Sequence, residues 1–161
     1  MLNLNKKDII AITSILKSRI SNSFLEYKDV IKSKSSDIYI ISGGFKEIIY
    51  EVVKDFDIKE NQIFANEFIY DGDMICGIKK DNPLSRKDGK INALKQINLN
   101  YGAYAIGDGY TDFEMKQISE VKSFICYTEN IKRPAVLEVA DYIAPNLGSV
   151  FNYIEKMESN G

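Results

Sequence analysis

The fold of this chain is decided by one polar stretch, Gly107-Asp108-Gly109-Tyr110-Thr111-Asp112. An apolar run at residues 104–106 precedes it, and a segment with helical spacing follows at residues 113–118. That order predicts a buried strand, a tight glycine loop and a helix start. The two carboxylates would then lie at the C-terminal end of a strand, where open α/β sheets bind ligands, and their oxygens suit Mg²⁺. The alternative is a purely structural turn in which Asp112 caps the helix.

Outward from this stretch, short apolar runs alternate with amphipathic segments. Strands are predicted at residues 37–41, 62–65, 104–106, 123–127 and 142–144, and a hairpin at residues 68–76 across an Asp-Gly turn. Helical spacing is found at residues 6–20, 24–31, 48–56, 91–97, 136–140 and 147–154, with Ser23 as the expected N-cap of the second helix. This rhythm predicts an α/β fold of three layers around a parallel sheet.

The bulk composition excludes several classes of protein. The 161 residues are 45% hydrophobic and 27% charged, which suits one globular domain with its own core. The net charge of −2, without a basic block, gives no indication of a nucleic-acid or anionic-membrane partner. Cys76 and Cys126 form no Cys-x-x-Cys motif and are expected to be free thiols. No signal peptide or membrane span is recognisable, so a cytoplasmic location is expected.

The chain contains no histidine. Ser-His-Asp catalysis, Cys-His catalysis and histidine-ligated zinc are therefore all excluded. Any chemistry must depend on carboxylates, hydroxyls, lysine and a hard metal ion.

Two further polar sites are expected at equivalent positions in the fold. Ser42-Gly43-Gly44 follows the first predicted strand and offers a hydroxyl and backbone N–H groups at a helix start, where an anion can bind. Lys90 begins a predicted helix, where the helix dipole disfavours a cation unless an anion is near. The structural alternatives are a simple turn at the glycines and a solvated lysine.

Serine, lysine and paired aspartates in this order resemble the later motifs of the haloacid dehalogenase superfamily, most closely the phosphoserine phosphatases. Residues 41–45 are similar to the second motif of that group, Lys90 with Leu94 to the third, and residues 107–112 to the fourth. The resemblance covers residues 37 to about 155. It implies a Rossmann-like fold with a β-hairpin flap.

The resemblance also implies roles for individual residues. Ser42, Gly43 and Gly44 would hold phosphoryl oxygens, and Lys90 would neutralise charge during catalysis. Asp108 would be a catalytic ligand of Mg²⁺, and Asp112 would bind or orient the ion. Thr111 would face the substrate, a small phosphorylated metabolite such as phosphoserine; asparagine is often found there in the family.

The first motif of the family, Asp-x-Asp on the central first strand, is not recognised in this sequence. Asp71-Gly72-Asp73 has the spacing but falls in the predicted hairpin, after the second motif. Residues 1–36 resemble the end of the helical cap that follows the first motif in the family. We therefore expect a cap remnant at residues 1–36 and a core domain at residues 37–161, without the central strand.

Loss of that strand would leave two unpaired edges, for which three alternatives stay open. The strands that end at Ile41 and Ile106 pair directly, another chain such as a second copy supplies a strand, or the sequence is part of a longer enzyme. Without the nucleophile we expect no hydrolysis by this chain alone. The functional alternatives are thus an incomplete phosphatase and a non-catalytic pseudophosphatase that binds a phosphorylated metabolite or acts as a regulatory or interaction module.

Overall fold

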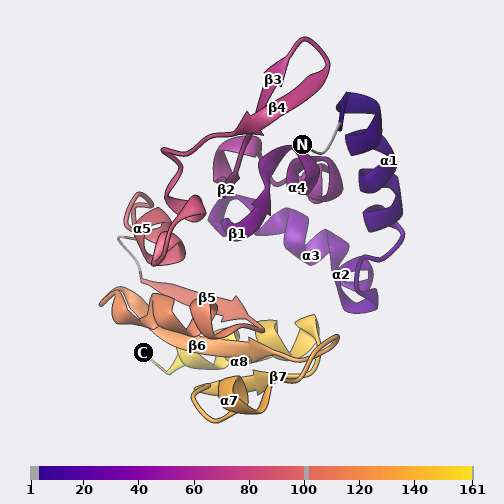
Figure 1. Ribbon diagram of the computed structural model, residues 1–161. Helices are drawn as coiled ribbons and strands as arrows, with labels where there is room; N and C mark the ends of the chain where they lie inside the picture. Colours follow the sequence, from indigo (N-terminus) through magenta and orange to yellow (C-terminus); the bar gives the residue numbers. More distant parts are fainter. Residues whose placement is uncertain (1–3, 100–101, 161) are drawn as a thin grey trace. The chain divides into compact units, whose positions relative to one another are not determined.

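The computed structural model describes residues 4–99 and 102–160. From residue 40 onward strands alternate with helices, except at residues 63–78, where three strands follow one another (Figure 1). The strands in the described ranges are β1 (Ile40–Phe45), β2 (Ile63–Asn66), β3 (Phe68–Asp71), β4 (Met74–Ile78), β5 (Ala103–Gly107), β6 (Val121–Tyr127) and β7 (Tyr142–Ala144). The α-helices there are α1 (Lys6–Lys17), α2 (Asn22–Glu26), α3 (Lys28–Ser33), α4 (Lys46–Val53), α5 (Gly89–Leu94), α6 (Tyr110–Phe113), α7 (Pro134–Leu137) and α8 (Leu147–Ser159).

The strands form three separate sheets. β1 pairs with β2 in parallel, β3 and β4 form an antiparallel hairpin, and β5, β6 and β7 form a parallel sheet in that order. The parallel pairing and the hairpin confirm the predicted α/β class. The parallel strands of the described ranges nevertheless lie in two sheets, not in the single sheet expected, because β1 and β5 each pair along one edge there.

The chain divides into two compact units. Unit 1 contains residues 1–20 and 28–93, and unit 2 contains residues 21–27 and 94–161. The predicted division into a cap remnant and a core after residue 36 stays a prediction. Along the described parts of the chain, no helix combines the length and the apolar character that a membrane span requires.

Unit 1 is built around the β1–β2 ladder, which α4 covers, and α1 packs on α4. α1 begins with a capping box in which Asn5 Oδ1 accepts from Lys7 N and Asp8 N, while Asn5 N donates to Asp8 Oδ2. The core side chains are apolar, as the stripes predict: Ile9, Ile31, Phe56, Ile58, Ile63 and Ala65. The hairpin turns at Gly72, whose φ of 58° suits glycine.

β1 differs from its predicted extent. The expected strand covered residues 37–41 and ended at the glycines, whereas β1 begins at Ile40 and continues through both glycines to Phe45. The ladder shifts register between Ile41 and Phe45, which pair with Phe64 and Asn66. The serine and the glycines are thus the extra residues of a bulge, which glycine tolerates and which sequence periodicity does not reveal.

Unit 2 is built on a sheet whose central strand, β6, is buried over most of its length. β5 pairs with β6 from Ala103↔Val121 to Gly107↔Cys126, so both strands end at the same edge. Its core contains fully buried side chains from the sheet and from α8: Phe124, Ile125, Cys126, Ala144 and Val150. The continuous apolar run in β6 therefore corresponds to a strand buried on both faces, whereas β5, predicted to be a buried strand, is buried only at Ala105.

The predicted helix at residues 24–31 is divided into α2 and α3, and the assignment of Ser23 as its N-cap is wrong. Ser23 lies inside α2, where its hydroxyl accepts from Leu147 N at 3.0 Å and donates to the Glu129 carboxylate. Glu129 also accepts from the Tyr127 hydroxyl. These long-range hydrogen bonds hold residues 21–27 in unit 2, and sequence spacing contains no signal for them.

Candidate functional site

The acidic stretch forms the expected strand, loop and helix start in unit 2. β5 ends at Gly107, Gly109 is the N-cap residue of α6, and the helix begins at Tyr110. Asp112 Oδ2 accepts the Gly109 N–H at 3.0 Å, and Gly109 O accepts the Asp112 N–H at 3.1 Å. Asp112 is the third residue of the helix rather than its N-cap, and its carboxylate closes the loop on itself.

Gly107 is required by the close approach of this carboxylate. A Cβ at position 107 would overlap with Cβ, Cγ and Oδ2 of Asp112. Since only 7% of Asp112 is exposed, its side chain has little room to move away. The loop is therefore a packed unit of fixed shape.

Asp108 is directed differently from Asp112. Its side chain is 44% exposed, and Oδ2 accepts hydrogen bonds from Arg133 Nε at 3.2 Å and Arg133 Nη2 at 3.0 Å. Arg133 precedes α7 and was not predicted to take part, because a separation of 25 residues along the chain carries no periodic signal. The site therefore contains one accessible carboxylate with a cationic partner and one buried carboxylate bonded to the loop.

The two carboxylates also act on Cys126 at the end of β6. Burial raises the pKa of the Cys126 thiol, and the negative charges of Asp108 and Asp112 raise it further. The thiol is therefore protonated near neutral pH and is a poor nucleophile. Thr111, predicted to face the substrate, is exposed in the first turn of α6.

The residues present fit a Mg²⁺ site in part. Asp108 offers an accessible, hard carboxylate oxygen, which suits direct coordination. Asp112 is engaged by Gly109 N, which suits the predicted orienting role better than direct coordination. Across residues 4–99 and 102–160, no group of three or more His, Cys, Asp or Glu side chains lies together as a metal-binding cluster.

In unit 1, Ser42 stands within the bulge of β1. Ser42 Oγ accepts the Gly44 N–H at 3.0 Å, which leaves the hydroxyl proton available for an acceptor. Gly43 and Gly44 are exposed, and α4 begins two residues later, at Lys46. The bulge therefore presents a hydroxyl and exposed backbone directly before a helix of eight residues.

Asn66, at the end of β2, supports this bulge. Its Nδ2 donates to Gly43 O at 2.9 Å, and the residue is 9% exposed. Two buried oxygens in unit 1, Asn66 Oδ1 and Glu47 Oε2, have no hydrogen-bond partner among the described protein groups. Sequence reasoning missed Asn66, although a polar residue at the end of an apolar strand run is the available signal.

Lys90 lies at the start of α5, as predicted, and is half-buried. The preceding loop is fixed to the end of β2, because Asn82 Nδ2 donates to Ala65 O at 2.6 Å and Asn82 Oδ1 accepts from Leu84 N. Gly89 packs against the backbone of Pro83 so closely that a Cβ there would lie 2.5 Å from Pro83 O. These contacts place the start of α5 at the same end of the β1–β2 ladder as Ser42.

The structure thus groups the predicted site residues in two sets. Ser42, Gly43, Gly44 and Lys90 belong to unit 1, and Asp108, Thr111 and Asp112 belong to unit 2. That the two sets meet at one phosphate stays a prediction.

The Asp-x-Asp spacing occurs twice in the described chain, and neither pair follows a parallel strand. Asp71 and Asp73 border the hairpin turn, as predicted. Asp55 and Asp57, which sequence reasoning passed over, lie at the 3₁₀ helix η2 (Lys54–Phe56). Asp55 forms an ion pair with Lys17 at 3.1 Å.

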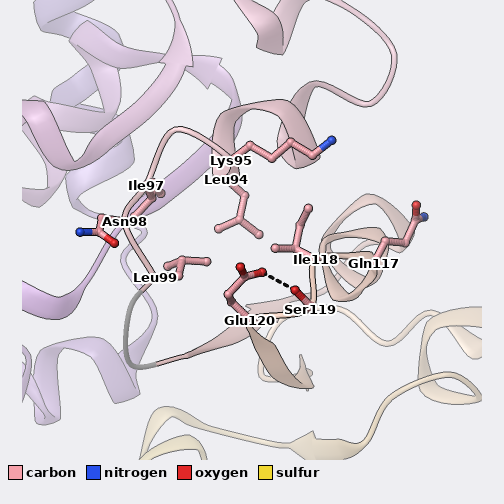
Figure 2. Close-up of a pocket in the computed structure, with 9 residues that line it drawn as sticks. All are labelled: Leu94, Lys95, Ile97, Asn98, Leu99, Gln117, Ile118, Ser119 and Glu120. Carbon is pink, nitrogen blue, oxygen red and sulfur yellow. Dashed lines mark hydrogen bonds between the residues drawn. The ribbon is translucent and has the colours of Figure 1, made fainter.

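A hollow of about 710 Å³ lies in unit 2 near the starts of β5 and β6 (Figure 2). Leu94, Leu99 and Ile118 line it together with Glu120, whose carboxylate accepts from Ser119 Oγ at 2.7 Å. That hydroxyl lowers the pKa of Glu120. Because Asp108 follows the other end of β5, this hollow is separate from the acidic loop.

Comparison with family models gives a match over residues 11–117, to the haloacid dehalogenase-like hydrolase model. Among curated proteins, the chain is 33% identical over 141 residues to the chloroplastic phosphoserine phosphatase of Arabidopsis thaliana, covering 85% of this chain and 48% of that protein. It is 29% identical over 131 residues to the phosphoserine phosphatase of Drosophila melanogaster, covering 78% and 47%. The chain spans about half the length of these relatives.

Solved structures give a consistent result. A phosphoserine phosphohydrolase-like protein from Francisella tularensis subsp. tularensis SCHU S4 matches with a TM-score of 0.77 and 25% identity, over 93% of this chain and 70% of that one. DsGPDH of Dunaliella salina matches in fold, with a TM-score of 0.69 and 22% identity, over 90% of this chain and 25% of that one.

Proposed function

The chain belongs to the haloacid dehalogenase-like hydrolase family, and we propose that it carries the phosphate-binding and Mg²⁺-binding parts of a phosphoserine phosphatase-like phosphomonoesterase. The observation that carries this proposal is the acidic loop. An accessible Asp108 and a buried, loop-closing Asp112 follow a parallel strand within the segment that resembles the phosphoserine phosphatases.

Asp108 would hold Mg²⁺ directly, and Asp112 would orient it while fixing the loop. When bound, the ion would offset negative charge on the phosphoryl oxygens. The packing of Asp112 against Gly107 keeps the loop in one conformation before any ligand arrives. Such preorganisation lowers the cost of binding and of catalysis.

Ser42 would donate its hydroxyl proton to a phosphoryl oxygen, because Oγ already accepts the Gly44 N–H. Gly43 would add its backbone N–H, and Asn66 would keep the bulge in shape through Gly43 O. Lys90 would place its ammonium group near the same anion, since the loop before α5 is fixed to the end of β2. Hydroxyl, amide and ammonium donors together suit phosphate.

We propose that the 161 residues alone bind phosphate without hydrolysing a phosphomonoester. Both Asp-x-Asp pairs discussed above lie outside the ends of the parallel strands, where a nucleophile would have to meet the anion. The substrate class would be phosphoserine or a similar small metabolite. The alternative is a pseudophosphatase that senses such a metabolite. The position of the two Asp-x-Asp pairs supports it equally.

Complementation by another strand is a second element of the proposal. Within the described residues, β1 and β5 each keep one edge without a strand partner. Tyr39 and Ile106, beside and within these strands, are 44% and 42% exposed. Because bare apolar edges favour strand addition, we propose that a strand from a second copy of this chain or from another segment pairs there. Light scattering would detect a homodimer.

Calorimetry with inorganic phosphate, with and without Mg²⁺, tests the function. We expect the chain to bind phosphate more tightly with Mg²⁺, and Lys90→Gln to weaken that binding by about tenfold, because a charge-assisted contact is lost. Lys87→Gln is the matched control, since it removes the same charge three residues earlier, from the loop that precedes α5. No phosphate binding at millimolar concentration, or equal loss in both variants, would contradict the proposed site.

A parallel assay follows phosphate release from phosphoserine by the same chain. We expect no release above background. Turnover that Asp108→Asn abolishes would overturn the proposal of binding without hydrolysis and leave the proposed site in place.

A further inference from the structure

The ion pair between Arg133 and Asp108 involves one oxygen of the carboxylate that the proposed function assigns to Mg²⁺. Both guanidinium contacts, from Nε and Nη2, go to Oδ2 of Asp108. A cation that binds this oxygen must displace the guanidinium, because two positive groups at contact distance repel each other.

The backbone of Arg133 is fixed, whereas its side chain is half exposed. Arg133 O accepts the N–H groups of Val136 at 2.9 Å and Leu137 at 3.1 Å, and Pro134 restricts the first turn of α7. The side chain itself is 51% exposed, so it can leave Asp108 without disturbing a packed core. A fixed backbone and an exposed side chain together allow the guanidinium to pair with Asp108 reversibly.

We propose that Arg133 is the counter-ion of Asp108 in the metal-free chain and that a divalent cation exchanges with it. The inference rests on the proposed function, which assigns Asp108 to Mg²⁺. Arg133 is then a positioning residue: it holds the carboxylate in place without metal and weakens metal affinity through competition and repulsion. An ion pair that does not involve Asp108 would have no such effect on metal affinity.

Arginine Nε–H resonances in NMR spectra of the full chain test the pair itself. We expect the Arg133 Nε–H signal to shift strongly in Asp108→Asn without metal, and to move in the same direction when Mg²⁺ is added to the unaltered chain. A signal that Asp108→Asn leaves unchanged would overturn the inference, whatever the fate of the proposed function.

Calorimetric titration with Mg²⁺ tests the exchange. We expect Arg133→Gln to tighten Mg²⁺ binding about two- to fivefold, the range that a half-exposed ion pair can account for. The Mg²⁺ affinity of Arg133→Lys should fall between those of the unaltered chain and Arg133→Gln, since lysine keeps the charge and loses the bidentate geometry. Asp108→Asn should abolish Mg²⁺ binding both in the unaltered chain and in the Arg133→Gln variant.

Lys122→Gln is the matched control. Lys122 also belongs to unit 2 and forms a half-exposed ion pair, with Glu158 at 2.9 Å, but it lies near the start of β6. It changes the net charge equally and should leave Mg²⁺ affinity unaltered. Equal tightening in both variants, or weaker binding in Arg133→Gln, would overturn the inference alone. Failure of the unaltered chain and of Arg133→Gln to bind Mg²⁺ would remove the proposed metal role and the exchange together.

Discussion

Two glycine-bearing stretches of similar sequence character adopt opposite structures. The stretch at residues 42–44 stays within β1 as a bulge, keeps both glycines exposed and leads directly into the eight residues of α4. The stretch at residues 107–112 leaves β5, folds onto its own buried carboxylate and opens the four-residue helix α6. One presents backbone to solvent, and the other uses a side chain to fill the loop.

The difference shows that glycine has two separate uses here. At Gly107 the missing Cβ makes room for Asp112, so the glycine is a packing requirement. At Gly43 an added Cβ would meet nothing within 4 Å, so packing does not require the glycine. The bulge itself and the approach of a ligand to the backbone are then the remaining uses for an exposed glycine in this strand.

The largest expected effect is on stability at Gly107. Gly107→Ala should lower the free energy of unfolding by about 2–4 kcal/mol, because the new methyl group overlaps with a buried carboxylate that cannot move. Gly43→Ala, the matched substitution in the other stretch, should change it by less than about 0.5 kcal/mol. Urea denaturation monitored by circular dichroism measures both, and similar losses would show that the two stretches are alike.

An intermediate effect separates the two aspartates. Asp112→Ala should cost about 1–2 kcal/mol of stability, because the Gly109 N–H loses its acceptor inside the loop. Asp108→Asn should cost less than about 1 kcal/mol, since it removes only a half-exposed ion pair, yet it should lose Mg²⁺ binding. Denaturation and Mg²⁺ titration of both variants measure these effects. A larger loss of stability in Asp108→Asn than in Asp112→Ala would contradict the roles assigned to the two aspartates.

The smallest effect concerns pH and Glu129 in unit 2. Burial acts to raise the pKa of Glu129, but hydrogen bonds from Ser23 and Tyr127 outweigh it, so the pKa is lowered. A lowered folded-state pKa gives stability that is present above the unfolded value, near 4.5, and is lost as the pH falls through the folded value.

Glu129→Gln should therefore reduce the loss of stability that accompanies a fall in pH below about 4.5. This change in stability should be smaller than the one that Gly107→Ala or Asp112→Ala causes at neutral pH. The measurement is the urea midpoint between pH 3 and pH 7. An unchanged pH profile would show that the contacts of Glu129 do not hold residues 21–27.

Much of the fold was predictable because it depends on local patterns. The apolar runs of β5, β6 and β7, the Asp-Gly hairpin and the stripe of α8 were all identified from periodicity. The bulge in β1 and the break between α2 and α3 were not, because the first depends on ladder register with β2 and the second falls where the chain passes from unit 2 to unit 1. Contacts between distant residues leave no periodic trace.

The site divides in the same way. Ser42, Lys90, Asp108 and Asp112 were candidates because they were expected to follow strands or begin helices. The structure places Lys90, Asp108 and Asp112 at such positions, whereas Ser42 lies inside β1. Arg133 and Asn66 were not candidates, since their importance depends on which side chain lies opposite them.

By itself, the sequence determined the α/β class and the positions where polar residues interrupt apolar runs, because those follow from spacing along the chain, and its motifs carried the resemblance to the family. Only the tertiary structure decided that Asp112 faces inward and Asp108 outward, and that an arginine 25 residues further on neutralises the outward one. The physical reason is that burial and charge pairing are properties of neighbours in space. Two aspartates in one loop acquire different roles only when packing takes up one and leaves the other exposed.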